Sequence, residues 1–224
     1  MITATFSIVG RCPKTGDMGV ATASKYLAVG AVVPWAEEGV GAVATQHWGS
    51  PRMAQRALAL MRDGHQPKQV LTQLIADDGE KAVTRQLALM DTQGRKAAWT
   101  PSLDTADPNA KYFGHLELDD AIVLGNTLAW LQVLEAMRAK FAELEKTGVS
   151  LAWRLLAALK AGDDAGGDHR GKQSAAILVV SGRKGVAEDI HKLNYRVDDH
   201  PAPMDELIRI YKLRFNRLGA DYIN

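Results

Sequence analysis

The spacing of apolar residues changes several times along this chain, and each spacing predicts a different element. Two short β-prone runs, residues 5–11 and 19–24, flank the turn-forming segment 12–17, which contains proline, glycine and aspartate. Strands on either side of such a turn form a β-hairpin. The apolar segments 31–35 and 41–46 are predicted to be extended as well, the second buried on both faces. The beginning of the chain is therefore predicted to be sheet.

Helical spacing follows this region. Ser50 is a good N-cap, Pro51 suits the first helical position, and apolar residues then recur every three or four positions up to Gly64. A second helix at about residues 67–76 and two strands at residues 86–90 and 96–100 are predicted next. A block of helices thus follows the first block of strands.

The second half of the chain repeats this order. Its longest helical pattern runs from Leu128 to Leu144 and a shorter one from Leu151 to about Gly162, so we expect two antiparallel neighbouring helices. A last helix is predicted at about residues 202–218. The remaining extended segments are predicted at residues 112–118, 121–124, 174–180 and 193–197, and the polar segment 101–110 is predicted to be a loop bordering a pocket. This order predicts two stacked sheets flanked by helices, in a single α/β (α+β) domain spanning residues 1–224.

Composition narrows the class of protein. The chain has 224 residues, 46% of them hydrophobic, which is enough for one sizeable core. Its 27 basic and 26 acidic residues leave no net field that would attract nucleic acid or an anionic membrane. Residues 1–11 show no basic segment followed by an apolar run, so no secretion signal is expected. We therefore expect a soluble cytoplasmic protein with no nucleic-acid or membrane partner.

Several local segments together resemble an Ntn-hydrolase-like family long catalogued as a domain of unknown function, number ten twenty-eight. The resemblance covers nearly the whole chain and rests on TFSIV at 5–9, ASKYLAVG at 23–30, VPWA at 33–36, GVGAVATQ at 39–46, GN at 125–126, GDHRGKQSAA at 167–176 and RVDDHP at 196–201. It implies a four-layer αββα sandwich of the N-terminal-nucleophile (Ntn) hydrolase type. By superfamily analogy it also implies hydrolysis of a carbon–nitrogen bond, an amide or a lactam, in a small polar substrate.

The resemblance also implies a nucleophile. In Ntn hydrolases the first residue of the processed chain attacks the carbonyl, and its own α-amine, with a pKa of about 8, is the base. Thr5 matches that nucleophile, but Met1 to Ala4 precede it here. Either these residues are removed, or another base acts, or the site is not catalytic. Ser7 is the nearest alternative hydroxyl, because residues two apart on a strand share a face.

Two polar residues are candidates for assisting Thr5. Lys25 is expected to face Thr5 across the hairpin as a base or electrostatic aid, since burying an unpaired lysine is costly. Its neighbour Ser24 makes a serine–lysine pair in sequence, although adjacent side chains on a strand diverge. Asn126 either donates its amide to an oxyanion or caps a helix that begins at Thr127.

Five polar residues are candidates for holding a substrate, and Ser24 is the first of them. Gln46 and His47 end a buried strand, where polar side chains often line the open edge of a sheet. The alternative for His47 is a loop histidine whose hydrogen bonds are satisfied within the protein, which is the more common outcome. Asp168 and Arg170 lie two apart before a core strand. They either anchor the carboxylate and amine of a substrate or form a structural ion pair with each other.

No cofactor or metal is expected. The run Asp198–His200 has no second ligand pair at a known metal spacing, and no glycine-rich phosphate loop opens a helix. Cys12 is expected to lack a placed partner and to be inert. The last helix has an apolar stripe at Met204, Leu207, Ile208, Tyr211 and Phe215, and its remaining surface suits a homodimer or higher homo-oligomer. The alternative to a hydrolase is a non-catalytic ligand-binding or scaffold protein that kept the fold.

Overall fold

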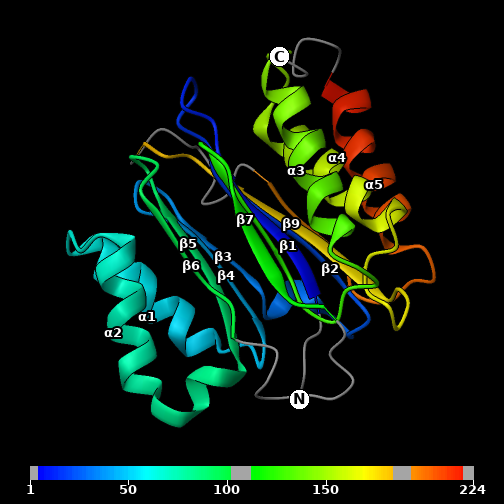
Figure 1. Cartoon of the computed structure of the whole chain (residues 1–224). Helices are drawn as coiled ribbons and strands as arrows, with labels where there is room; N and C mark the ends of the chain where they lie inside the picture. Colours follow the sequence, from blue (N-terminus) through cyan, green and yellow to red (C-terminus); the bar gives the residue numbers. More distant parts are fainter. Residues whose placement is uncertain (1–4, 102–111, 184–192, 219–224) are drawn as a thin grey trace.

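The structure, a computed structural model, describes residues 5–101, 112–183 and 193–218, with side chains up to residue 214. Most of the loop predicted at residues 101–110 and the side chain of Phe215 lie outside the described residues. The described part is an α+β protein with two antiparallel sheets, which confirms the predicted class (Figure 1).

The larger sheet contains the predicted N-terminal hairpin at its centre. It has six strands in the order β10-β9-β2-β1-β8-β7, and every neighbouring pair is antiparallel. Its strands are β1 (Thr5–Arg11), β2 (Met18–Ser24), β7 (Gly114–Glu117), β8 (Ala121–Gly125), β9 (Ser174–Val180) and β10 (Leu193–Val197). The first residue of β1, Thr5, pairs with the last residue of β2, Ser24.

The smaller sheet has four strands in the order β3-β4-β5-β6, also antiparallel. Its strands are β3 (Pro34–Glu37), β4 (Gly41–His47), β5 (Arg85–Asp91) and β6 (Lys96–Trp99). The two sheets face each other across an apolar cluster that includes Val9 and Val20 from the larger sheet and Ala42 and Met90 from the smaller one.

Helices cover the outer face of each sheet (Figure 1). The smaller sheet is covered by α1 (Pro51–Arg62) and α2 (Pro67–Asp78), with which it shares a second apolar cluster. The larger sheet is covered by α3 (Gln132–Glu145), α4 (Leu151–Asp164) and α5 (Pro203–Leu218), with which it forms the third cluster. Met204, Leu207 and Tyr211 of α5 are buried in this cluster, so this part of its apolar stripe belongs to the core of the chain.

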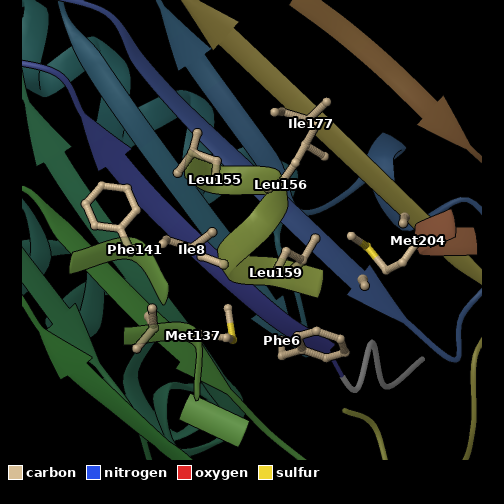
Figure 2. Close-up of a cluster of buried hydrophobic side chains, with 14 of the residues drawn as sticks. Phe6, Ile8, Met137, Phe141, Leu155, Leu156, Leu159, Ile177 and Met204 are labelled. Atoms are coloured by element: carbon tan, nitrogen blue, oxygen red, sulfur yellow. The ribbon is translucent and has the colours of Figure 1, made fainter. Parts of the chain in front are cut away.

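The alternation of β1 decides which of its side chains can belong to a polar site. Phe6 and Ile8 point to the helical side, where they contact the α3 and α4 layer (Figure 2). Thr5, Ser7 and Val9 therefore point to the space between the sheets. A strand buried on both faces normally carries apolar residues throughout. The two hydroxyls on the inner face are thus the exception that marks a polar centre.

Two predicted elements differ from the structure at their beginnings. The segment predicted as extended at residues 31–35 starts with a short 3-10 helix, Val29–Ala31, and the strand begins only at Pro34. The helix predicted from Leu128 begins at Gln132, because Thr127 has a left-handed φ of 49° and the chain turns before it can coil. Leu128 instead forms an isolated antiparallel β-bridge with Asp168, and Leu131 is a turn residue, so these two positions only mimic a helical spacing.

Within residues 5–101, 112–183 and 193–218, no helix combines the length and the apolar character needed to cross a membrane.

Candidate active site

Buried polar side chains gather at one end of the two sheets, around Thr5. Most of them lie at the beginning of β1, β5 and β9 or at the end of β2, β4 and β8, which antiparallel pairing brings to the same edge, and the others lie in the segments that follow β8 and precede β9. The members are Thr5, Ser24, Gln46, His47, Gln86, Asn126, Thr127, Asp168 and Ser174, each 5% exposed or less. Buried polar groups must be hydrogen-bonded to be tolerated, so this cluster holds a defined geometry.

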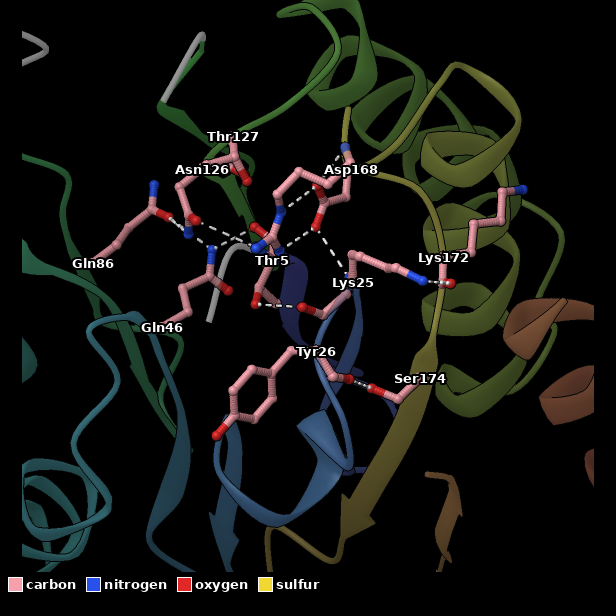
Figure 3. Close-up of polar contacts among 12 residues, drawn as sticks. Thr5, Lys25, Tyr26, Gln46, Gln86, Asn126, Thr127, Asp168, Lys172 and Ser174 are labelled. Carbon is pink, nitrogen blue, oxygen red and sulfur yellow. Dashed lines mark hydrogen bonds and ion pairs between the residues drawn. The ribbon is translucent and has the colours of Figure 1, made fainter. Parts of the chain in front are cut away.

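Every polar atom of Thr5 has a contact within this cluster (Figure 3). Its N–H donates to Asn126 Oδ1 at 3.2 Å, and its hydroxyl donates to Ser24 Oγ at 3.3 Å. Its carbonyl oxygen accepts from Gln46 Nε2 at 3.1 Å and from the Asn126 N–H at 3.0 Å. Thr5 is thus fixed in position from both sheets, and it is fully buried.

Three side-chain amides connect the two sheets next to Thr5. Gln86 Oε1 accepts from Gln46 Nε2 at 2.7 Å and from Asn126 Nδ2 at 2.9 Å. Gln86 Nε2 donates to the carbonyl of Gly125 at 2.9 Å and to the hydroxyl of Thr100 at 3.0 Å. Gln86 was not among the candidates from the sequence. A glutamine at the start of an otherwise apolar strand is the signal that would have found it.

Asn126 follows β8 and its side chain accepts a hydrogen bond from Thr5, so the prediction that it caps a helix beginning at Thr127 is wrong. The helix begins at Gln132. The carboxamide is engaged at both ends, since Oδ1 accepts from Thr5 and Nδ2 donates to Gln86. Asn126 is therefore placed to orient the nitrogen of Thr5.

Ser7 lies one step deeper between the sheets. Its hydroxyl is 2.6 Å from Gln46 Oε1 and 2.9 Å from Thr22 Oγ1, and it is fully buried. These contacts favour a structural role for Ser7, in which it holds Gln46 in place for its bond to Thr5.

Lys25 directly follows Ser24, the residue that pairs with Thr5. Its side chain nevertheless does not face Thr5 as predicted. The residue is exposed, and its ammonium donates to the carbonyl of Lys172 at 3.3 Å (Figure 3). Lys172 in turn forms an ion pair with Asp163 at 2.6 Å. Burial raises the pKa of the Asp163 carboxyl above its ordinary value, against the opposing effect of Lys172. Lys25 is therefore a cation at the border of the cluster rather than a base in contact with Thr5.

Asp168 and Arg170 form a two-pronged ion pair at the edge of the cluster. The carboxylate accepts from Arg170 Nε at 3.0 Å and from Arg170 Nη2 at 2.8 Å. It also accepts from the backbone N–H of Lys25 at 3.0 Å, which ties the end of β2 to the loop before β9. The Arg170 side chain is 32% exposed while Asp168 is buried. The pair thus presents a fixed guanidinium to solvent beside the Thr5 cluster.

Backbone strain is concentrated in the same region. Within the described chain, the residues other than glycine with a positive φ are Ala28 at 54°, His47 at 65° and Thr127 at 49°. They lie at or just beyond the ends of β2, β4 and β8, the strands that carry Ser24, Gln46 and Asn126 toward Thr5. Such conformations cost about 1 to 3 kcal/mol each and persist mainly where the surroundings require them, often at functional sites. His47 is also held by an edge-to-face contact with Phe113, with ring centroids 4.9 Å apart.

The comparisons with known proteins agree with the resemblance seen in the sequence. The sequence model described as "Family of unknown function (DUF1028)" matches residues 5–207. The crystal structure of a Silicibacter pomeroyi protein assigned to DUF1028 superimposes with a TM-score of 0.81 at 31% identity, covering 98% of this chain and 92% of that chain. Anbu (ancestral beta-subunit) from Yersinia bercovieri gives a TM-score of 0.43 at 12% identity, covering 98% of each chain, and this likeness is too distant to carry an argument. The search of curated proteins gives no match.

Proposed function

Because the chain belongs to the family of unknown function DUF1028, we propose that it is a hydrolase of a carbon–nitrogen bond with Thr5 as its nucleophile. The proposal includes a four-layer αββα sandwich of the Ntn-hydrolase type, with residues 1–224 forming one domain. The observation that carries the proposal is the placement of Thr5 at the first position of the central strand β1, with its nitrogen on Asn126 and its hydroxyl on Ser24.

The chemistry requires a free amine at Thr5. In the chain with Met1 to Ala4 attached, the Thr5 nitrogen is a peptide nitrogen, and Thr5 is fully buried, so no substrate reaches its hydroxyl. Removal of these residues would leave an α-amine within reach of Asn126 Oδ1, which accepts from the same nitrogen now. An α-amine with a pKa of about 8 is partly neutral near pH 7 and serves as a base. We propose that the form beginning at Thr5 is the active one.

The proposed reaction uses the hydroxyl and the amine of Thr5. Thr5 Oγ1 attacks the carbonyl carbon while the Thr5 amine takes the hydroxyl proton and delivers it to the leaving nitrogen. Water subsequently cleaves the ester on Thr5 and releases a carboxylic acid. Asn126 orients the amine through Oδ1, and Gln46 and Gln86 hold Asn126 and the Thr5 carbonyl in position.

The substrate we propose is a small polar amide or lactam. The guanidinium of Arg170 is fixed by Asp168 and partly exposed at the border of the site, where it suits a carboxylate on the substrate. Lys25 adds a second cation at the same border, and Ser24 and His47 belong to the surrounding buried polar cluster. Cytoplasmic location and assembly as a homodimer or higher homo-oligomer remain part of the proposal.

A specific observation also favours a second function, that of a non-catalytic ligand-binding or scaffold protein. Thr5 is fully buried with its nitrogen in a peptide bond, and all its polar atoms have contacts within the protein. A polar cluster of this kind can serve stability alone. Activity decides between the two functions.

The test compares the full chain with a form beginning at Thr5, released from a cleavable fusion, against a panel of small amides and lactams. We expect turnover by the form beginning at Thr5, lost by at least about a thousandfold in Thr5→Ala. Thr72→Ala is the control, because it removes a threonine hydroxyl from the exposed face of α2 and should leave activity unchanged.

Intact mass identifies which form is active in each preparation. Full activity in Thr5→Ala would sink the assignment of the nucleophile. Absence of turnover in both forms across the panel would support the non-catalytic alternative.

A further inference from the structure

A cavity of about 330 Å³ lies between the β1–β2 turn and the beginning of α4. Its wall includes Cys12, Ser150, Leu151 and Arg154, and its rim includes the exposed residue Lys14. Since β1 rises by about 3.3 Å per residue over its length, this cavity lies on the order of 20 Å from Thr5. Its volume falls in the range of small-molecule sites, about 300 to 1,000 Å³.

Arg154 is a buried cation, and one of its N–H groups has no hydrogen-bond acceptor among the described residues. The residue is 3% exposed, and its guanidinium lies 5.4 Å from the centroid of the Phe141 ring. Among the described residues, its Nε has no hydrogen-bond acceptor. Burying a charged group with an unused donor is costly, so this atom is a place where a ligand acceptor would be favourable.

Glu145 gives the cavity a complementary acceptor. Its Oε1 is buried and makes no hydrogen bond to the described residues, but it forms an ion pair with Arg154 Nη1 at 3.6 Å. A second acid in the wall, Asp120, is already paired with Arg11 at 2.5 Å. The wall of the cavity therefore contains an ion pair in which Arg154 Nε and Glu145 Oε1 lack hydrogen-bond partners among the described residues.

We propose that this cavity binds a free α-amino acid, with its carboxylate on Arg154 and its ammonium on Glu145. A simple anion would face the charge of Glu145, and a simple cation would face Arg154. A zwitterion whose two charged groups share one carbon satisfies both at once. The beginning of α4 adds partial positive charge on the side of the carboxylate.

Cys12 provides a reporter inside the cavity. It is the single cysteine of the chain. Burial raises the pKa of its thiol, but hydrogen bonds from Thr15 and from the Thr15 and Lys14 backbone, together with the charge of Arg154, lower it below the ordinary value. The prediction that Cys12 lacks a placed partner is therefore wrong. A lowered pKa increases the thiolate fraction, which favours alkylation of Cys12.

The experiment titrates the full chain with the common L-amino acids, using calorimetry and the rate of Cys12 alkylation by iodoacetamide as two readouts. We expect at least one amino acid to bind and to slow alkylation at least threefold. The N-acetyl form and the amide form of that amino acid, each lacking one charge, should bind at least tenfold more weakly.

Variants test the two residues. Arg154→Met keeps a long apolar stem against Phe141, and Glu145→Gln keeps the size of the partly exposed Glu145 side chain. Each should weaken binding at least tenfold, while Arg138→Met on the exposed face of α3 should not change it. If Arg154→Met fails to fold, Glu145→Gln and the ligand analogues still test the proposal. No binding of any amino acid, or equal binding of the N-acetyl or amide form, would overturn the proposal.

Discussion

Asn126 shows how a single side chain links the nucleophile candidate to both sheets. Its Oδ1 accepts from the Thr5 nitrogen, its Nδ2 donates to Gln86, and its backbone N–H donates to the Thr5 carbonyl. The side chain is fully buried, so these contacts are made without competition from water. The geometry of Thr5 therefore depends on an amide that can both donate and accept.

Asn126→Leu tests this dependence, because leucine has a similar shape and neither donates nor accepts. The Thr5 N–H would be left buried without its acceptor, and Gln86 Oε1 would lose one of its two donors. We expect the free energy of unfolding, measured in urea, to fall by about 2 to 3 kcal/mol. The matched control Asn194→Leu, on the exposed part of β10, should stay within about 0.5 kcal/mol. A small effect of Asn126→Leu equal to that of the control would contradict this role.

The residues of the site were only partly predictable from the sequence. Thr5, Ser24, Gln46 and Asn126 were expected at strand ends, and the structure brings them together. The direction of Lys25 was not predictable, because a flexible side chain at the end of a strand is placed by its tertiary neighbours, here the carbonyl of Lys172.

Among the elements, the central β1–β2 hairpin depends on two opposed glycines. Gly10 pairs with Gly19. A Cβ on Gly19 would lie 2.5 Å from the carbonyl oxygen of Leu178 on the neighbouring strand β9, a backbone atom that cannot move alone. A Cβ on Gly10 would first meet the flexible end of Leu155, at 3.1 Å.

The two positions make a matched pair for a stability experiment. Gly19→Ala should lower the free energy of unfolding by about 2 to 3 kcal/mol, because strand β9 must shift. Gly10→Ala should cost less, about 1 kcal/mol or below, because Leu155 can adopt another rotamer. Urea unfolding of the two variants measures the difference. Equal losses of stability, or a larger loss for Gly10→Ala, would show that the packing between β2 and β9 does not determine the cost of these substitutions.

Element types were predictable over most of the described chain, while their beginnings were less so. The apolar spacing of β1, β2 and β9 and of α1 and α4 follows the periods of strand and helix. The start of α3 was predicted too early, since the left-handed Thr127 is set by contacts that local spacing does not encode. The same holds for Ala28 before β3.

At the scale of the whole molecule, the site exists because two sheets face each other and bring polar residues at the ends of their strands together around Thr5. The stacking of the sheets could be predicted from the order of strands and helices along the chain. The contacts of Gln46 with Thr5 and Gln86 could not. Such long-range contacts between strands of different sheets leave no periodic trace in a single sequence. These contacts are therefore known from the structure and not from the spacing of residues.

The most direct test of the central claim is to trap the nucleophile. The full chain and the form beginning at Thr5 are treated with a β-lactone, an electrophile that acylates activated hydroxyls, and the adduct is located by peptide mass spectrometry. We expect a single adduct on Thr5 in the form beginning at Thr5, and none in the full chain or in Thr5→Ala. An adduct on Ser7 or another residue, or no adduct in a folded form beginning at Thr5, would contradict it.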